Sequence, residues 1–195
     1  MSRMLKIAAI AVFLLLIVLL SFGALRNFFS ARQPPSAFEA SVATRLRALS
    51  IPKLEASAKN PVANSPEVLQ EAARHFADHC ASCHGNDGSG NTEMGQHLFP
   101  RAPDMQLKAT QELSDGELYY IIHNGVRWTG MPAWGEPGDD QDSWKLVWFI
   151  RHLPNLTPAE LRDMERFNPK SAAEQEEEKE EQEFLEGTPH QEKHK

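Results

Sequence analysis

The chain has 195 residues, a formal net charge of −7 and only two cysteines, Cys80 and Cys83. This length allows one domain, or one domain with appendages. Charge is unevenly distributed, with +6 over residues 1–60, −7 over 61–170 and −6 over 171–195. The acidic balance gives no reason to expect a nucleic-acid partner, and the three segments differ clearly in kind.

An uncharged, apolar run of nineteen residues extends from Ile7 to Leu25. A helix of this length covers about 28 Å, which is close to the hydrocarbon thickness of a bilayer. A cleaved signal peptide is the alternative, but its apolar region is typically about 7–15 residues long. The best cleavage candidate, residues 21–23, lies inside the run. We therefore expect residues 1–26 to be an uncleaved signal-anchor that spans the membrane through residues 7–25.

A linker is predicted over residues 27–64, where prolines are frequent and large apolar residues are sparse. One short amphipathic helix is expected within it, from Ala37 to Leu49, with apolar residues spaced by four, four and three. These are Phe38, Val42, Leu46 and Leu49. The pattern indicates a tether with a helical piece that lies against the membrane or against the following domain.

The next helix leads into the most informative motif of the chain. Ser65, Pro66 and Glu67 are typical of a helix start, and apolar residues then recur at helical spacing up to Cys80. Residues 80–84 read Cys-Ala-Ser-Cys-His, which is the C-x-x-C-H attachment site of a c-type haem. One helical turn separates the two thiols, so both face the same way. Haem attachment would consume both cysteines and leave none for a disulfide.

Two other uses are known for closely spaced cysteines of this kind. A redox C-x-x-C pair is disfavoured because no βαβ pattern surrounds it. A zinc site would need further ligands in a tetrahedral arrangement.

After the motif, loops and helices alternate. A glycine-rich loop occupies residues 85–91, and a Pro-Arg-Ala-Pro segment occupies 100–103. A helix is expected from Ser114 to an Asn-Gly stop at 124–125. A Thr-Gly-Met-Pro loop follows at 129–132, and a last helix is expected from Ser143 to Leu153, ended by Pro154.

Residues 65–155 resemble a class I cytochrome c domain, with Cys-x-x-Cys-His early and a Thr-Gly-Met-Pro loop late. The resemblance implies an all-α cytochrome c fold around one covalently bound haem, preceded here by the transmembrane helix. It also implies that the first and last helices pack crosswise. Ala72 and Phe76 stand at the first-helix contact positions, and either Trp148 or Phe149 would supply the aromatic residue from the last helix.

The resemblance also implies a set of residues around the haem. His84 is the expected proximal ligand, and Met131 is the expected distal ligand. A proline carbonyl, most plausibly that of Pro103 rather than Pro100, would orient the His84 ring. The competing ligands are weaker by position, namely Met94, Met105, Met164, His97, His123 and His152. Arg127 and Trp128 are candidates to contact a haem propionate.

The last segment, residues 156–195, is acidic and is expected to be a solvated helix or disordered. Phe184 and Leu185 are candidates for a docking point. His190 and His194, four residues apart, are candidates for weak metal binding.

The leading functional hypothesis is a membrane-tethered carrier of single electrons, not an enzyme, in a bacterial respiratory chain. An alternative is a tightly bound cytochrome c subunit of a dehydrogenase or oxidase. A haem sensor or peroxidase would need an open distal site, against which Met131 argues. The acidic domain suggests a redox partner with a basic docking patch. Because haem c is attached outside the cytoplasmic membrane in such proteins, the domain should face the periplasm.

Overall fold

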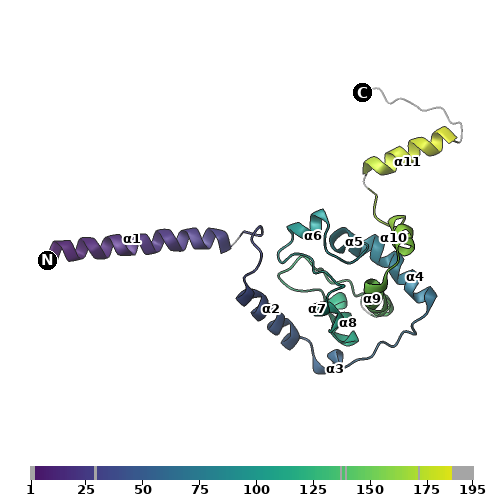
Figure 1. Cartoon of the computed structure of the whole chain (residues 1–195), viewed down its shortest axis with the longest axis horizontal. Helices are drawn as coiled ribbons and strands as arrows, with labels where there is room; N and C mark the ends of the chain where they lie inside the picture. Colours follow the sequence, from purple (N-terminus) through teal and green to yellow (C-terminus); the bar gives the residue numbers. More distant parts are fainter. Residues whose placement is uncertain (1–2, 29, 137, 139, 171, 186–195) are drawn as a thin grey trace.

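A computed structural model describes residues 3–28, 30–136, 138, 140–170 and 172–185. These residues form helices and connecting loops and no β-sheet, which confirms the all-α expectation (Figure 1). The helices of eight or more residues are α1 (Arg3–Phe28), α2 (Ala37–Ser50), α4 (Pro66–His75), α8 (Asp115–Asn124), α9 (Gln141–His152), α10 (Pro158–Glu165) and α11 (Ala172–Leu185). Shorter helices are α3 (Lys53–Ala56), α5 (Ala81–His84), α6 (Glu93–His97) and α7 (Lys108–Gln111), with a π-helical turn at Phe76–Cys80 and a 3₁₀ turn at Leu153–Asn155.

The core forms where α4 and α9 pack against each other. Ala72 and Phe76 are each 1% exposed. This burial is expected of the contact positions predicted on the first helix of the domain, which is α4 with the turn that follows it. Phe149 supplies the aromatic residue from α9, because its ring lies 4.9 Å from that of Phe76 and it is 1% exposed. Trp148 is half-buried, and its indole N–H donates a hydrogen bond of 2.8 Å to the Val62 carbonyl.

The helix boundaries follow from local capping signals. The Ser65 side chain accepts a hydrogen bond from the Val68 amide at the start of α4, and Pro66 occupies the first turn. Ser114 and Glu117 form a reciprocal capping box at the start of α8. The predicted Asn-Gly stop of α8 is confirmed, since the helix ends at Asn124 and Gly125 has a φ of 66°.

Arg151 ties the end of α9 to the start of α8. Its guanidinium contacts the Asp115 carboxylate, with Nη2 to Oδ1 at 2.9 Å, and donates to the carbonyls of Gln111 and Leu113. A half-buried arginine shared among three acceptors fixes the spacing between the two helices, because each acceptor constrains a different part of the planar group.

The second half of the segment expected as a linker packs onto the domain. Ile51 is 5% exposed, and the Ser114 hydroxyl donates a hydrogen bond of 2.6 Å to the Ala56 carbonyl. The Asn60 amide donates to the Trp144 carbonyl at 2.8 Å. Residues 51–62 are therefore held against α8 and α9.

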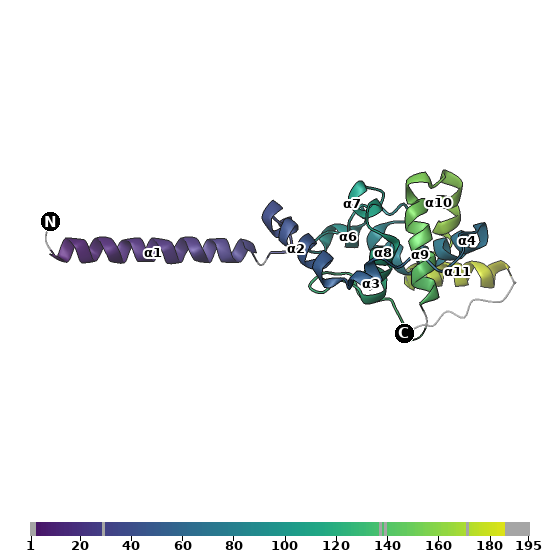
Figure 2. The same ribbon diagram turned by 90° about the horizontal axis from the view of Figure 1, so that it is seen from below.

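The outer helices lie at the periphery of the molecule. Residues Arg3–Gly23 of α1 are long and apolar enough to cross a membrane, and none of that span is buried against the rest of the chain. Both views place α2 between α1 and the rest of the domain (Figures 1 and 2). Helix α11 extends from the other side, and its described side chains are exposed. His190, His194 and the Phe184 side chain lie outside the described residues.

Candidate functional site

The Cys-x-x-Cys-His motif begins where helix α4 changes pitch. The π-helical turn Phe76–Cys80 carries Cys80, and the short helix α5 carries Cys83 and His84. His84 is 8% exposed, while the two cysteines are half-buried and are not joined to each other. The motif therefore lies at the wall of the core, with all three side chains adjacent to one cavity.

The chemistry of the cysteines argues against a redox-active pair. Burial and the neighbouring Cys83 raise the pKa of the Cys80 thiol to about 12. Redox-active C-x-x-C pairs instead have lowered pKa values. Within the part of the chain that the structure describes, no group of three or more His, Cys, Asp or Glu side chains is placed to hold a metal ion.

The cavity beside the motif has a volume of about 320 Å³, at the lower end of the range for small-molecule and cofactor sites. Cys80, Cys83, His84 and Met131 line it together. Most of the remaining wall is apolar, from Phe76, Leu98, Pro100, Ala102, Pro103, Met105, Leu113, Leu118, Ile121, Ile122, Val126, Pro132, Trp134, Leu146 and Ile150. An apolar cavity with two thiols, an imidazole and a thioether on its surface fits a haem attached through two thioether bonds.

The loop that carries Met131 is held by its own hydrogen bonds. The Val126 amide donates to the Met131 carbonyl at 3.0 Å, and the Met131 amide donates to the Thr129 hydroxyl at 3.1 Å. Thr129 in turn donates to the Val126 carbonyl at 2.7 Å. These contacts fix the backbone of Met131 at the edge of the cavity.

Gly125 anchors the same loop to the end of α8. A Cβ atom at this position would lie 2.5 Å from the carbonyl carbon of Pro132, closer than real Cβ contacts permit. Together with its φ of 66°, this close approach requires glycine. The Asn-Gly stop thus ends a helix and also allows the Met131 loop to pass next to it.

The other methionines and histidines are distributed differently. Met105 also lines the cavity and is 8% exposed, so it is the one competing methionine that the structure brings to the site. Met94 is 55% exposed, and Met164 is buried against a different part of the domain. His97, His123 and His152 do not line the cavity, whereas His79, adjacent to Cys80, does.

Pro103 lies on the wall of the cavity next to His84. Burial lowers the pKa of His84, and the Pro103 backbone carbonyl acts in the opposite direction. The Nδ1 atom of His84 is buried and makes no hydrogen bond of normal geometry. The proximity of the Pro103 carbonyl to this buried ring is what the expected role of Pro103, as acceptor for the imidazole of a metal-ligating histidine, requires.

The loop of Pro103 is packed tightly against the glycine-rich loop. Gly90 has a φ of 70°, and a Cβ there would lie 2.4 Å from the Ala102 carbonyl oxygen. The Gly90 amide donates to the His84 carbonyl at 2.7 Å, and the Ala102 amide donates to the Gly95 carbonyl at 3.0 Å. The position of Pro103 relative to the motif is thereby set by backbone contacts.

Two arginines line the cavity, Arg47 and Arg101. Arg127 and Trp128, the candidates for a propionate contact, do not line it, and Trp128 is 88% exposed. Sequence reasoning missed Arg47 because it lies on α2, within the expected linker. No local signal distinguishes it from Arg45 two positions earlier.

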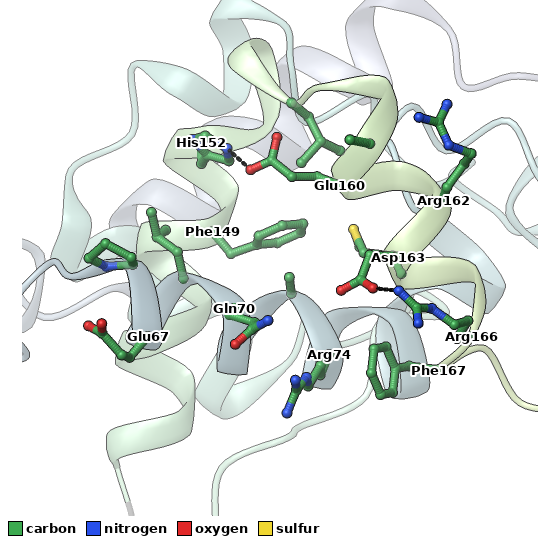
Figure 3. Close-up of a pocket in the computed structure, with 16 residues that line it drawn as sticks. Glu67, Gln70, Arg74, Phe149, His152, Glu160, Arg162, Asp163, Arg166 and Phe167 are labelled. Atoms are coloured by element: carbon green, nitrogen blue, oxygen red, sulfur yellow. Dashed lines mark hydrogen bonds and ion pairs between the residues drawn. The ribbon is translucent and has the colours of Figure 1, made fainter.

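A second, larger groove of about 920 Å³ lies between α4, α9 and α10 (Figure 3). Phe149 lies at its centre, the His152 ring contacts Glu160 at 2.8 Å, and Arg166 pairs with Asp163. It contains no residue of the Cys-x-x-Cys-His motif or of the Met131 loop. Although this groove is larger than the cavity beside the motif, it lacks the residues expected to hold a haem, so we do not assign it as the functional site.

Comparison with known proteins shows a similarity that covers part of the chain. Residues 67–150 match the family described as cytochrome c oxidase, cbb3-type, subunit III. The chain is similar to the Cbb3-type cytochrome c oxidase subunit FixP of Rhizobium meliloti (strain 1021), with 35% identity over 91 residues. It is 38% identical over 91 residues to the FixP subunit of Sinorhizobium medicae (strain WSM419). Each match covers 46% of this chain and 29% of the relative, so the similarity spans less than a third of the length of these curated relatives.

Proposed function

We propose that this chain, whose residues 67–150 are a class I c-type cytochrome domain, is a membrane-anchored carrier of single electrons. The observation that carries the proposal is the shared cavity, which brings Cys80, Cys83 and His84 together with Met131. If His84 and Met131 both bound the iron of a haem in this cavity, no coordination position would remain for a substrate.

The domain implies one haem c, bound covalently through Cys80 and Cys83. His84 and Met131 are the proposed iron ligands, with Pro103 as the proposed acceptor for His84. Arg47 and Arg101 are the charged groups able to pair with propionates. The bound haem supplies a reversible one-electron change of valence, and a methionine ligand raises its reduction potential.

The remaining residues of the cavity exclude water and hold the ligands in place. Its wall is mainly apolar, which disfavours the more highly charged oxidised state. The hydrogen bonds of the Met131 loop and the close contact at Gly125 keep the thioether near its working position. The role of the protein is therefore to position and desolvate the haem, without an acid or base acting on a substrate.

A second candidate function is a permanent subunit of an oxidase complex, and the names of the relatives favour it. The electron-transfer chemistry would be the same in both cases. For either, we propose that the domain faces the periplasm, that α1 is retained as its anchor, and that the partner presents a basic patch to this acidic domain.

The test is the visible spectrum of the haem-loaded full chain and of two variants. We expect Met131→Ala to lose the weak long-wavelength band of methionine-ligated ferric haem and to bind carbon monoxide when reduced. Met105→Ala is the matched control, since Met105 lines the same cavity and should keep that band. If only Met105→Ala lost the band, Met105 would be assigned as the iron ligand in place of Met131. A wild-type protein that binds carbon monoxide readily would favour a sensor or peroxidase.

A further inference from the structure

Helix α2 carries an apolar stripe that nothing in the described chain covers. The stripe consists of Phe38, Val42, Leu46 and Leu49, which are 77%, 39%, 58% and 82% exposed. Their spacing of four, four and three places them on one face of the helix. Contiguous exposed apolar residues of this kind mark a surface that contacts another protein or a membrane.

The stripe is not an unfinished part of the haem cavity. Successive helical residues are rotated by about 100°, so Arg47 lies on the side of α2 opposite the stripe. Arg47 is the α2 residue that lines the cavity, and it is half-buried. The helix therefore turns its polar side toward the haem site and its apolar side away from it.

The position of α2 along the chain keeps it close to the membrane. Only eight residues separate the end of α1 at Phe28 from the start of α2 at Ala37. Fully extended, they reach at most about 29 Å. Both views show α2 between the membrane-crossing helix and the rest of the domain (Figures 1 and 2). The stripe is thus tethered near the lipid surface at a high effective concentration.

The charge around α2 is opposite to that of the rest of the chain. Arg26 and Arg32 precede it in the sequence and Arg45 and Arg47 are part of it, while Glu39 is the only acidic residue between positions 26 and 49. Basic residues beside an apolar stripe, on a helix of low overall hydrophobicity, are typical of helices that lie in the interface of membranes with anionic lipids. A partner with a basic patch would instead be repelled here.

We propose that α2 lies in the membrane–water interface, with Phe38, Val42, Leu46 and Leu49 among the acyl chains and Arg47 turned toward the haem cavity. The inference rests on the proposed function, in which α1 is the membrane anchor. Two attachments, one across the membrane and one along its surface, fix both the distance and the orientation of the haem cavity relative to the bilayer. A single flexible tether would fix neither.

The test uses the full-length, haem-loaded protein in vesicles of phosphatidylcholine and phosphatidylglycerol. An environment-sensitive fluorophore is attached to one introduced cysteine at a time, in Leu46→Cys, Thr44→Cys and Leu16→Cys. Leu46 is on the stripe, Thr44 is exposed on the opposite side of α2, and Leu16 is in α1. Each variant is compared between vesicles with and without doxyl-labelled lipids, so that quenching by the haem cancels. An unchanged haem spectrum shows that the variant is folded.

We expect doxyl lipids to quench the fluorophores at positions 16 and 46 several-fold and the one at 44 only slightly. Omitting phosphatidylglycerol should weaken quenching at 46 and leave that at 16 unchanged. Equal, weak quenching at 44 and 46 with strong quenching at 16 would overturn the placement of α2 and leave the anchor intact. In unlabelled Leu46→Cys, formation of disulfide-linked dimers in the vesicles would overturn it in favour of a second copy. Absence of quenching at 16 would overturn the anchor, and the placement of α2 with it.

Discussion

The ring of Phe149 on α9 contacts the ring of Phe76 on the turn that leads into the haem motif, with 4.9 Å between their centroids. Phe76 in turn lies 6.5 Å from the His84 ring and lines the haem cavity. Helix α9 is therefore connected to His84, the proposed proximal ligand, through one aromatic pair. On that proposal, packing of α9 on α4 supports the position of His84 as well as the stability of the domain.

Replacing Phe149 should be among the most destabilising single changes in the domain. Its side chain is fully buried, so Phe149→Ala should lower the free energy of unfolding by about 3–5 kcal/mol. Trp148→Phe is the matched control, because it keeps an aromatic ring and loses the hydrogen bond to the Val62 carbonyl. That loss should cost about 1 kcal/mol. Denaturant unfolding of the haem-loaded protein measures the loss of stability in both variants. If Trp148→Phe were more destabilising than Phe149→Ala, Trp148 would be the main aromatic contact between α9 and α4.

Gly125→Ala should loosen the Met131 loop. A methyl group there collides with the Pro132 backbone and forces a non-glycine residue to a positive φ. We expect destabilisation of about 2–5 kcal/mol and a partial loss of the methionine-ligand band. Gly138→Ala controls for the dihedral angle, since Gly138 has a φ of 89° and open space around its Cβ position. It should cost about 1–2 kcal/mol and leave the spectrum unchanged. Equal effects of the two variants would show that the contact with Pro132 is unimportant.

Much of this architecture could be predicted because its signals are local. Ser65 and Pro66 mark the start of α4, Asn124 and Gly125 mark the end of α8, and each feature depends on residues within one turn. The Cys-x-x-Cys-His motif is similarly local. Its convergence with the Met131 loop on one cavity agrees with the expectation from the family resemblance.

Other features depend on tertiary contacts that a local pattern does not encode. Trp148 and Phe149 are neighbours on α9, and both fit the apolar spacing, but only their positions relative to Phe76 and Val62 distinguish them. The π-helical turn before Cys80 leaves the apolar spacing of α4 unchanged in the sequence. Arg47 reaches the cavity only because residues 51–62 hold the preceding helix near it.

Arg47→Gln should lower the reduction potential of the haem. Removing a positive charge from the cavity wall destabilises the less positive, reduced iron relative to the oxidised iron. The expected decrease is on the order of tens of millivolts, as Coulomb interaction at intermediate dielectric gives for a single charge. Arg45→Gln is the control, because Arg45 is on the same helix, is exposed and does not line the cavity. A potentiometric titration measures both variants, and equal shifts would show that Arg47 acts only through net charge.

The hydrogen-bonded carboxylate of Glu160 should make stability depend on pH in the acidic range. Burial raises the pKa of Glu160, but hydrogen bonds from Thr157 and the His152 ring outweigh it and lower the pKa below its usual value. The ionised carboxylate therefore stabilises the folded state above the ordinary pKa of a glutamate, about 4.3, and this contribution is lost as the pH falls through the lower, folded-state pKa.

Glu160→Gln removes this titration while keeping the shape of the side chain. We expect the wild type to be more stable than Glu160→Gln at pH about 6, and the difference to shrink steadily as the pH falls below about 4. His152→Gln should reduce this pH dependence without abolishing it, because the hydrogen bonds from Thr157 to Glu160 remain. Unfolding curves of the three proteins across this pH range measure the effect. A difference that stays constant with pH would show that Glu160 contributes by packing alone.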